Sequence, residues 1–212
     1  MYIPRKFALS DEETAAALAQ AGFAHLVTHA STGLMVTPLP LLYDDSRHSL
    51  VGHVARANPH WRADGGESVA VFAGPHTYIS PSFYATKAET GKVVPTWNYE
   101  VLSVYGQLLA HDDPDWVLNL VTTLTNHHEK RRPDPWQVTD APKSFTRAQL
   151  RAIVGVELIV SRVEGKAKMS QNQPERNRTG VVAGLKESNA PGDHLVADRV
   201  TSRGNTKPNG RG

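Results

Sequence analysis

Short apolar and alternating segments fill the first half of the chain. They are bounded by Gly, Pro, Asp and Ser, and they read FAHLVTHA, LMVTPLPLLYDD, SLVGHVA, SVAVFAG and HTYISPS. Segments of this kind are typical of β-strands, and STG between the first two predicts a hairpin. Pro38 and Pro40 cannot donate to a sheet, so the second strand leaves hydrogen-bonding positions open. Strand periodicity also extends over residues 96–112, with Gly106 predicted as a bulge, and over residues 154–170.

Helical signals occur at three places. The sequence SDEETAAALAQAG has a Ser followed three residues later by Glu and then an Ala-rich run, which predicts a capped helix over about residues 11–21. The sequence DDPDWVLNLVTTLTNHHEKRR starts with acids and Pro and carries apolar residues at helical spacing, so we expect a helix over about residues 115–130. In TRAQLRAIV, Thr146 with Gln149 predicts the capped start of a short helix.

The connections between the expected strands are too short for parallel crossovers. The order of elements therefore predicts a mainly β fold, an antiparallel β-barrel with flanking helices. We expect one domain over residues 1–185. From about Lys186 the chain has too few apolar residues to pack by itself, so residues 186–212 are predicted to form a low-complexity, disordered tail.

Composition excludes several classes of protein. The net charge is only +2, from 23 basic and 21 acidic residues, so the chain is not a polycation built to coat DNA. It has no cysteine, which excludes disulfides and thiolate metal sites. Because the N-terminus lacks an apolar signal region and no run approaches the roughly 18 apolar residues of a membrane span, we expect a cytoplasmic protein without a membrane partner.

The segment GHVARANPHW, residues 52–61, is the first candidate site. Arg56 ends a strand, Asn58 is suited to cap the following turn, and Pro follows it, so backbone N–H groups and a guanidinium would meet at one place. On the strand, His53 and Ala55 face one side and Val54 and Arg56 face the other. This pattern fits a phosphate site, and it equally fits a surface Arg beside an ordinary cap.

Two further segments could bind a ligand. In YISPSFYATKAETGKVVPTWNYE, five aromatic residues alternate with hydroxyl and amide side chains, as a flat polar heterocycle requires; an aromatic core is the alternative. In GKAKMSQNQPERNRTG, basic residues flank SQN, and this loop could be a solvated turn or a lid over an anion.

The histidines suggest weaker sites. His127, His128 and Glu129 adjoin at a helix end, where neighbours diverge by about 100°, so stabilisation of the helix C-terminus is favoured over metal binding. His25 and His29 would share one face of a strand, and a surface pair is the default interpretation. No metal site is predicted.

Taken in order, the segments MYIPRKF, VTPLPLLYD, GHVARANPHW, VFAGPHTYISPSFY, VPTWNYEVLSVYGQL, LTNHHE and KMSQNQP resemble the PaiB-type FMN-binding negative transcriptional regulators. This family is a branch of the flavin-binding split-barrel superfamily, which includes the pyridoxamine-phosphate oxidases. The resemblance covers residues 1 to about 185. It implies a split β-barrel and a homodimer with FMN between the protomers.

The resemblance also implies which residues hold FMN. The strand and turn of HVARANP would hold the phosphate, VTPL would follow the isoalloxazine edge, and TWNY and KMSQN would close the site, with the second subunit as one source of these last segments. The implied cofactor-binding residues are Thr37, Pro38, His53, Val54, Ala55, Arg56, Asn58, Trp97, Asn98, Lys168, Ser170, Gln171 and Asn172.

Three functions remain open at this point. The first is a flavoprotein with a regulatory or sensing output, as the family description implies, with DNA or a regulatory protein as partner. The second is a flavin-dependent oxidoreductase like the pyridoxamine-phosphate oxidases, for which no catalytic residue can be named. The third is a haem-binding split barrel with a histidine ligand. The sequence shows no helix-turn-helix pair that would decide for direct DNA binding.

Overall fold

The computed structural model describes residues 1–190 and 192–205. Its strands are β1 (Phe23–Ala30), β2 (Gly33–Pro40), β3 (Leu42–Asp44), β4 (Ser49–Ala55), β5 (Glu67–Ile79), β6 (Thr96–His111) and β7 (Ile153–Lys168). Its α-helices are α1 (Asp11–Ala19), α2 (Thr86–Thr90), α3 (Pro114–Glu129), α4 (Lys143–Arg151), α5 (Glu175–Lys186) and α6 (Asp193–Asn205). Short 3₁₀ turns are η1 (Arg5–Phe7), η2 (Pro59–Ala63), η3 (Pro81–Phe83) and η4 (Val138–Asp140).

The strands form one seven-stranded antiparallel sheet in the order β2-β1-β5-β6-β7-β4-β3. The predicted hairpin is confirmed, since β1 and β2 pair with Ala30 opposite Gly33. Because β2 is the edge strand, its two prolines cost the sheet little. The long strand predicted over residues 96–112 is β6, where a Cβ on Gly106 would lie 1.9 Å from the carbonyl oxygen of Ile159. Close backbone approach therefore requires glycine at this position.

Some predicted boundaries are wrong. The run LMVTPLPLLYDD forms two strands, β2 and β3, while SVAVFAG and HTYI form the single strand β5, which continues through Pro75. Helix α4 begins at Lys143 rather than at a Thr146 cap. The Thr146 hydroxyl instead donates to the carbonyl of Pro142, a contact made within the helix. The helices predicted near residues 11–21 and 115–130 are confirmed as α1 and α3.

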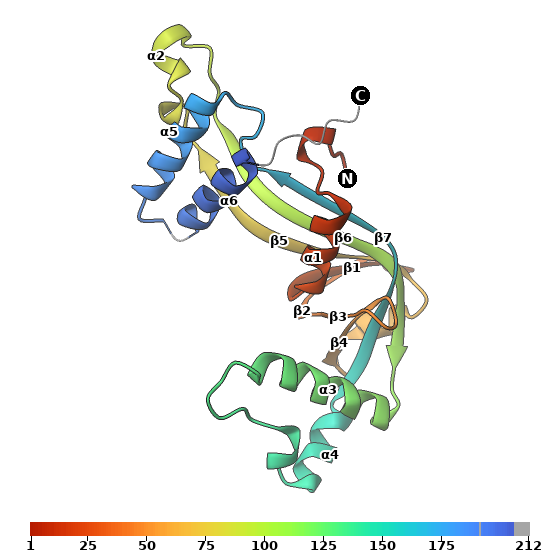
Figure 1. Cartoon of the computed structure of the whole chain (residues 1–212). Helices are drawn as coiled ribbons and strands as arrows, with labels where there is room; N and C mark the ends of the chain where they lie inside the picture. Colours follow the sequence, from red (N-terminus) through yellow and green to blue (C-terminus); the bar gives the residue numbers. More distant parts are fainter. Residues whose placement is uncertain (191, 206–212) are drawn as a thin grey trace. The chain divides into compact units, whose positions relative to one another are not determined.

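The chain divides into two compact units, to both of which β5, β6 and β7 contribute residues. The first unit contains residues 1–12, 73–102 and the described residues from 164 on. Its core joins Ile79 and Ala167 of the sheet to Val181 and Leu185 of α5 and to the buried face of α6. Helices α5 and α6 lie side by side (Figure 1).

Helix α6 corrects the expectation of a disordered segment after Lys186. Residues 193–205 form this helix, and Val196, Ala197 and Val200 are buried on one of its faces. These residues are too few to form a core alone, but they complete the core of α5, which the composition of the segment by itself does not reveal. Residues 206–212 of the predicted tail lie outside the described part of the chain.

The second unit contains residues 13–72 and 103–163. Alternation along β1 buries Ala24, Leu26 and Thr28 and directs the intervening side chains outward. Helix α3 packs on β4 of this unit, where Leu120 and Leu124 join Val51 in one cluster. This packing creates the pocket described below.

Candidate functional site

The predicted turn after β4 forms as expected. Asn58 caps the 3₁₀ turn η2, and its Oδ1 accepts a hydrogen bond from the backbone N–H of His60 at 3.0 Å. Its Nδ2 donates to Thr37 Oγ1 at 3.1 Å. The structure thus joins two predicted site residues, Thr37 and Asn58, while Pro38 next to them is exposed on the opposite face of β2.

A buried histidine that sequence reasoning missed connects this turn to β1. His60 Nδ1 lies 2.8 Å from Thr37 Oγ1, and its Nε2 lies 2.7 Å from Thr28 Oγ1. Thr28 Oγ1 is in turn 2.7 Å from Ser68 Oγ. Burial lowers the pKa of His60, so the ring is neutral near pH 7, with one nitrogen donating and the other accepting. Thr28 could have pointed to His60 from the sequence, because a hydroxyl that faces inward on β1 needs a polar partner.

Arg56 does not face an open anion site in this structure. Its guanidinium donates to both carboxylate oxygens of Asp112, at 2.9 and 2.5 Å, and to the carbonyls of Arg151 and Ile153, at 2.7 and 3.0 Å. The hydrogen bonds from Arg56 lower the pKa of Asp112, so the partner is ionised.

The amides around Arg56 are also occupied, contrary to the expectation of unpaired N–H groups. Those of Arg56 and Asn58 donate to the carbonyls of Ala152 and Ala55, both at 2.8 Å. A phosphate at Arg56 would have to replace the carboxylate of Asp112. Val54 points into the core and Ala55 is exposed, so these two residues contribute no polar side chain here.

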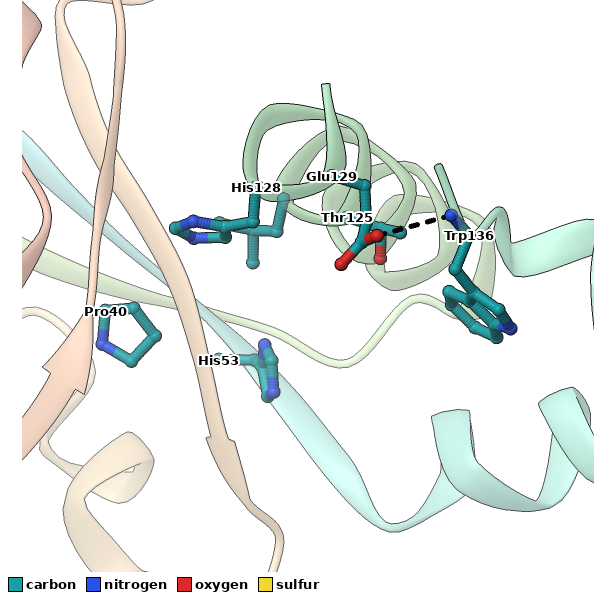
Figure 2. A pocket seen from close by; sticks show the side chains of 7 residues that line it. Pro40, His53, Thr125, His128, Glu129 and Trp136 are labelled. Carbon is teal, nitrogen blue, oxygen red and sulfur yellow. Dashed lines mark hydrogen bonds between the residues drawn. The ribbon is translucent and has the colours of Figure 1, made fainter. Parts of the chain in front are cut away.

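His53 lies in a pocket of about 280 Å³ on the second unit. The pocket is lined by Pro40, His53, Leu124, Thr125, His128, Glu129 and Trp136. Figure 2 shows His53 on β4 below the last turns of α3, with Trp136 on the segment that follows α3. The sequence pointed to His53. For His128 and Glu129 it favoured stabilisation of a helix end over metal binding, and it did not single out Trp136, which follows the predicted helix.

The Nδ1 atom of His53 is buried and has no hydrogen-bond partner among the described residues. Burial lowers the pKa of His53, which makes the ring neutral near pH 7. A buried polar atom without a partner costs roughly 1–3 kcal/mol, which a ligand group can recover by bonding to it. The pocket therefore suits a ligand with an apolar ring body and polar atoms at its edge.

The other predicted site residues belong to the first unit. Asn98 is buried and shares two hydrogen bonds with Ser170 Oγ, at 2.9 and 3.2 Å. Gln171 bonds back to the chain through Met169 N–H and the Ala167 carbonyl, both at 2.6 Å. Ser170 has a φ of +59°. These contacts hold the loop after β7 in a turn with Ser170 in the left-handed region. The side chains of Asn98, Ser170 and Gln171 therefore form their hydrogen bonds with other residues of the chain.

Trp97, Lys168 and Asn172 complete the predicted set. The indole of Trp97 is exposed and has His76 and Tyr78 as ring neighbours, at centroid distances of 6.5 and 6.3 Å. Lys168 donates to the hydroxyl of Thr96, and Asn172 is exposed. Trp97, His76 and Tyr78 thus form an exposed aromatic surface on the first unit.

Comparison with known proteins identifies the family. Residues 1–162 match the model of the family described as "Putative FMN-binding domain". The chain belongs to this FMN-binding family. It is 30% identical over 208 residues to "Protease synthase and sporulation protein PAI 2" of Bacillus subtilis, covering 96% of this chain and 98% of that protein. It is 33% identical over 186 residues to an uncharacterized protein, AN0679, of Emericella nidulans, covering 74% of each.

Solved structures show the fold. A FAD and haem binding protein from Mycobacterium smegmatis aligns with a TM-score of 0.57 at 15% identity, covering 77% of this chain and 74% of that one. The predicted split β-barrel class, the PaiB-type resemblance and FMN as the family's cofactor are confirmed.

Within residues 1–190 and 192–205, no helix has the length and hydrophobicity that crossing a membrane requires. Those residues also contain no cluster of three or more His, Asp or Glu that could hold a metal ion.

The His53 pocket fits part of FMN. The isoalloxazine ring system is flat and apolar on its faces, and its edge carries both hydrogen-bond donors and acceptors, so either role of His53 Nδ1 can be met. Ligand pockets for whole cofactors usually measure about 300–1,000 Å³, so 280 Å³ accommodates a ring but leaves the ribityl phosphate outside. Arg56 is a cation at the end of the same strand.

Proposed function

We propose that this protein binds FMN between two copies of itself and that the loaded protein has a regulatory or flavin-sensing output. The unpartnered Nδ1 of His53, in a pocket of a chain that belongs to an FMN-binding family, carries this proposal. The flavin ring would occupy the pocket beside His53. Arg56 would neutralise the phosphate after exchanging Asp112 for it, with Asn58 and Thr37 shaping the turn.

When bound, FMN supplies one- and two-electron redox chemistry. The chain contributes binding and orientation. His53 offers a neutral hydrogen-bonding nitrogen, and Pro40 and Leu124, which line the same pocket, would help to exclude water from a bound ring.

An exposed apolar face supports the homodimer. In the β1–β2 hairpin, Phe23, Leu34 and Val36 are 65%, 73% and 58% exposed and lie on the same side of the pair. This side continues along β2 through Pro38 to Pro40, which lines the His53 pocket. A second copy covering this face would bury apolar surface at the pocket's edge, and the proposed flavin site would then lie beside the contact between the two copies.

The regulatory output rests on the relative from Bacillus subtilis, whose name refers to protease synthesis and to sporulation rather than to a substrate. Direct DNA binding would show as affinity that falls steeply with salt concentration. No binding at about 50 mM salt would leave a regulatory protein as the partner.

Absorbance in the visible range tests flavin binding directly. Purified protein mixed with FMN and then desalted should retain about one flavin per chain. His53→Leu should lose a large part of it, whereas His194→Leu on α6 should not. If neither the wild type nor the variants retain flavin, the cofactor assignment is wrong.

Sedimentation velocity tests the dimer. Val36→Asp places a charge on the apolar face and should shift the protein to monomers, while Thr32→Asp, in the hairpin turn, should leave the dimer intact. A monomeric wild type would contradict the proposed arrangement.

A further inference from the structure

Trp136 lines the His53 pocket from a segment without apolar packing of its own. The segment joins α3 to η4, and every residue from 131 to 137 is exposed. The side chain of Trp136 is 48% exposed. Burial therefore does not explain how this segment keeps its position, and polar contacts must do so.

Glu129, at the last position of α3, supplies these contacts. Its Oε2 accepts a hydrogen bond from the backbone N–H of Trp136 at 3.3 Å (Figure 2). Its Oε1 accepts from Arg132 Nε at 3.1 Å, and its carbonyl accepts from Arg132 N–H at 2.8 Å. On the other side of Trp136, the N–H of Gln137 donates to Asp140 Oδ2 at 2.8 Å.

Two carboxylates thus bracket Trp136. Glu129 holds the backbone of Trp136 at the end of α3, and Asp140 holds the next residue, Gln137, at the start of η4, while the indole stays half open to solvent. A large aromatic side chain held in place but not covered is available to a ligand. His53 and Pro40 line the same pocket from the strands.

We propose that Trp136 is the aromatic wall against which the flavin ring packs, and that Glu129 is the positioning residue that holds it there. This inference rests on the proposed function, because it assumes that the ring enters the His53 pocket. Aromatic pairs contribute about 0.5–1.5 kcal/mol beyond area burial, which corresponds to roughly two- to twelvefold in affinity. The subsite recognises the ring and not the phosphate, so it accepts riboflavin as well as FMN.

Flavin emission reports on this contact independently of affinity. An indole next to an excited flavin donates an electron to the ring and takes it back without emission of light, so bound flavin is dim. The experiment titrates the 212-residue chain with FMN and with riboflavin, and it measures both the dissociation constant and the emission of the bound ligand. The variants are Trp136→Ala, Trp136→Phe, Glu129→Ala and Glu129→Gln, with Arg131→Ala, at an exposed position of the same segment, as the matched control.

The expected result has four parts. Trp136→Ala weakens both ligands by roughly two- to twelvefold and brightens their emission. Trp136→Phe retains most of the affinity but also brightens the emission. Glu129→Ala resembles Trp136→Ala, and Glu129→Gln restores wild-type behaviour because its amide oxygen still accepts from Trp136 N–H. Arg131→Ala, which leaves the contacts of Glu129 in place, matches the wild type.

Two outcomes overturn the inference, and they differ. If wild type binds FMN and the Trp136 and Glu129 variants change neither affinity nor emission, Trp136 is not the wall, and the proposed function stands. If wild type binds neither FMN nor riboflavin, the proposed function fails and this inference fails with it.

Discussion

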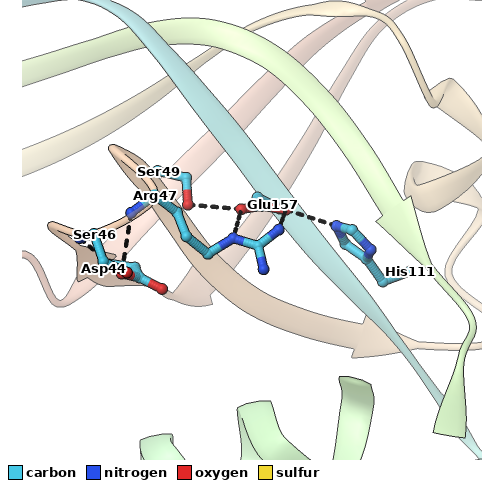
Figure 3. Close-up of polar contacts among 6 residues, drawn as sticks. All are labelled: Asp44, Ser46, Arg47, Ser49, His111 and Glu157. Carbon is cyan, nitrogen blue, oxygen red and sulfur yellow. Dashed lines mark hydrogen bonds and ion pairs between the residues drawn. The ribbon is translucent and has the colours of Figure 1, made fainter. Parts of the chain in front are cut away.

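Glu157 and His111 form a hydrogen bond of 2.7 Å inside the second unit, from His111 Nε2 to Glu157 Oε2. The Glu157 carboxylate has no exposed surface, and it also accepts from Arg47 Nε and Nη2 and from Ser49 Oγ, at 2.8 to 2.9 Å (Figure 3). The His111 ring stacks on Trp116 of α3 at 3.9 Å. This buried carboxylate therefore connects β4, the turn before it, β6 and β7.

Glu157→Gln should lower the free energy of unfolding by about 1–3 kcal/mol, because the amide cannot accept from all of these donors. Chemical denaturation measures the effect. Glu67→Gln, at an exposed position of β5, is the control and should change stability by less than about 0.5 kcal/mol. Equal effects of the two substitutions would show that the network does not stabilise the fold.

Acid should weaken the same network. Burial raises the pKa of Glu157, but the hydrogen bonds from Ser49, His111 and Arg47 outweigh it, so the pKa is lowered overall. Stability from a carboxylate with a lowered pKa is fully present above its unfolded value, about 4.3, and is lost as pH falls through the folded pKa. Denaturation curves below about pH 4.3 should show a smaller loss in Glu157→Gln than in the wild type.

We expect a second pH dependence of stability, closer to neutral pH, from His53 and His60. Burial lowers the pKa of both rings, so below about pH 6.5 the unfolded chain takes up protons that the folded chain does not. Stability should thus be highest above this pH and should fall as pH decreases toward the folded pKa values. Urea denaturation at about pH 7.5 and 5.5 measures the difference. His53→Leu should reduce it, and His194→Gln on α6 should not.

The ion pair between Arg56 and Asp112 allows a test of whether Arg56 binds the flavin phosphate. Arg56→Ala should weaken FMN by about tenfold, because a charged hydrogen bond is lost, and it should affect riboflavin less. Asp112→Asn should leave FMN binding equal to or tighter than that of the wild type, since it frees the guanidinium. Asp115→Asn, which removes a nearby exposed charge from α3, is the control. Equal loss of FMN and riboflavin in Arg56→Ala would show that Arg56 does not meet the phosphate.

Helix α6 should contribute to the stability of the first unit. Val200 is buried against α5, so Val200→Ala should lower the free energy of unfolding by about 1–2 kcal/mol. Leu195→Ala, on the 60% exposed Leu195 of the same helix, is the matched control and should have little effect. Thermal unfolding followed by circular dichroism distinguishes the two. If Val200→Ala and Leu195→Ala both unfold at the same temperature as the wild type, α6 does not contribute to stability.

Local signals in the sequence determined several elements of this protein and some of the residues at its turns. Alternation along residues 23–30 and the STG turn were sufficient for the β1–β2 hairpin, because side-chain period and turn chemistry act over neighbouring residues. The cap at Asn58 was also predictable, since its oxygen bonds an amide two residues away. The ordered set of motifs identified the family.

Only the tertiary structure decided which partners these residues have. Arg56 meets Asp112, 56 positions later in the chain, and the composition of α6 became meaningful only beside the apolar face of α5. The His53 pocket requires Trp136, which no local pattern connects to it. Side-chain partnership depends on distance in space, which packing of the whole sheet sets, whereas propensity and spacing report only on neighbours along the chain.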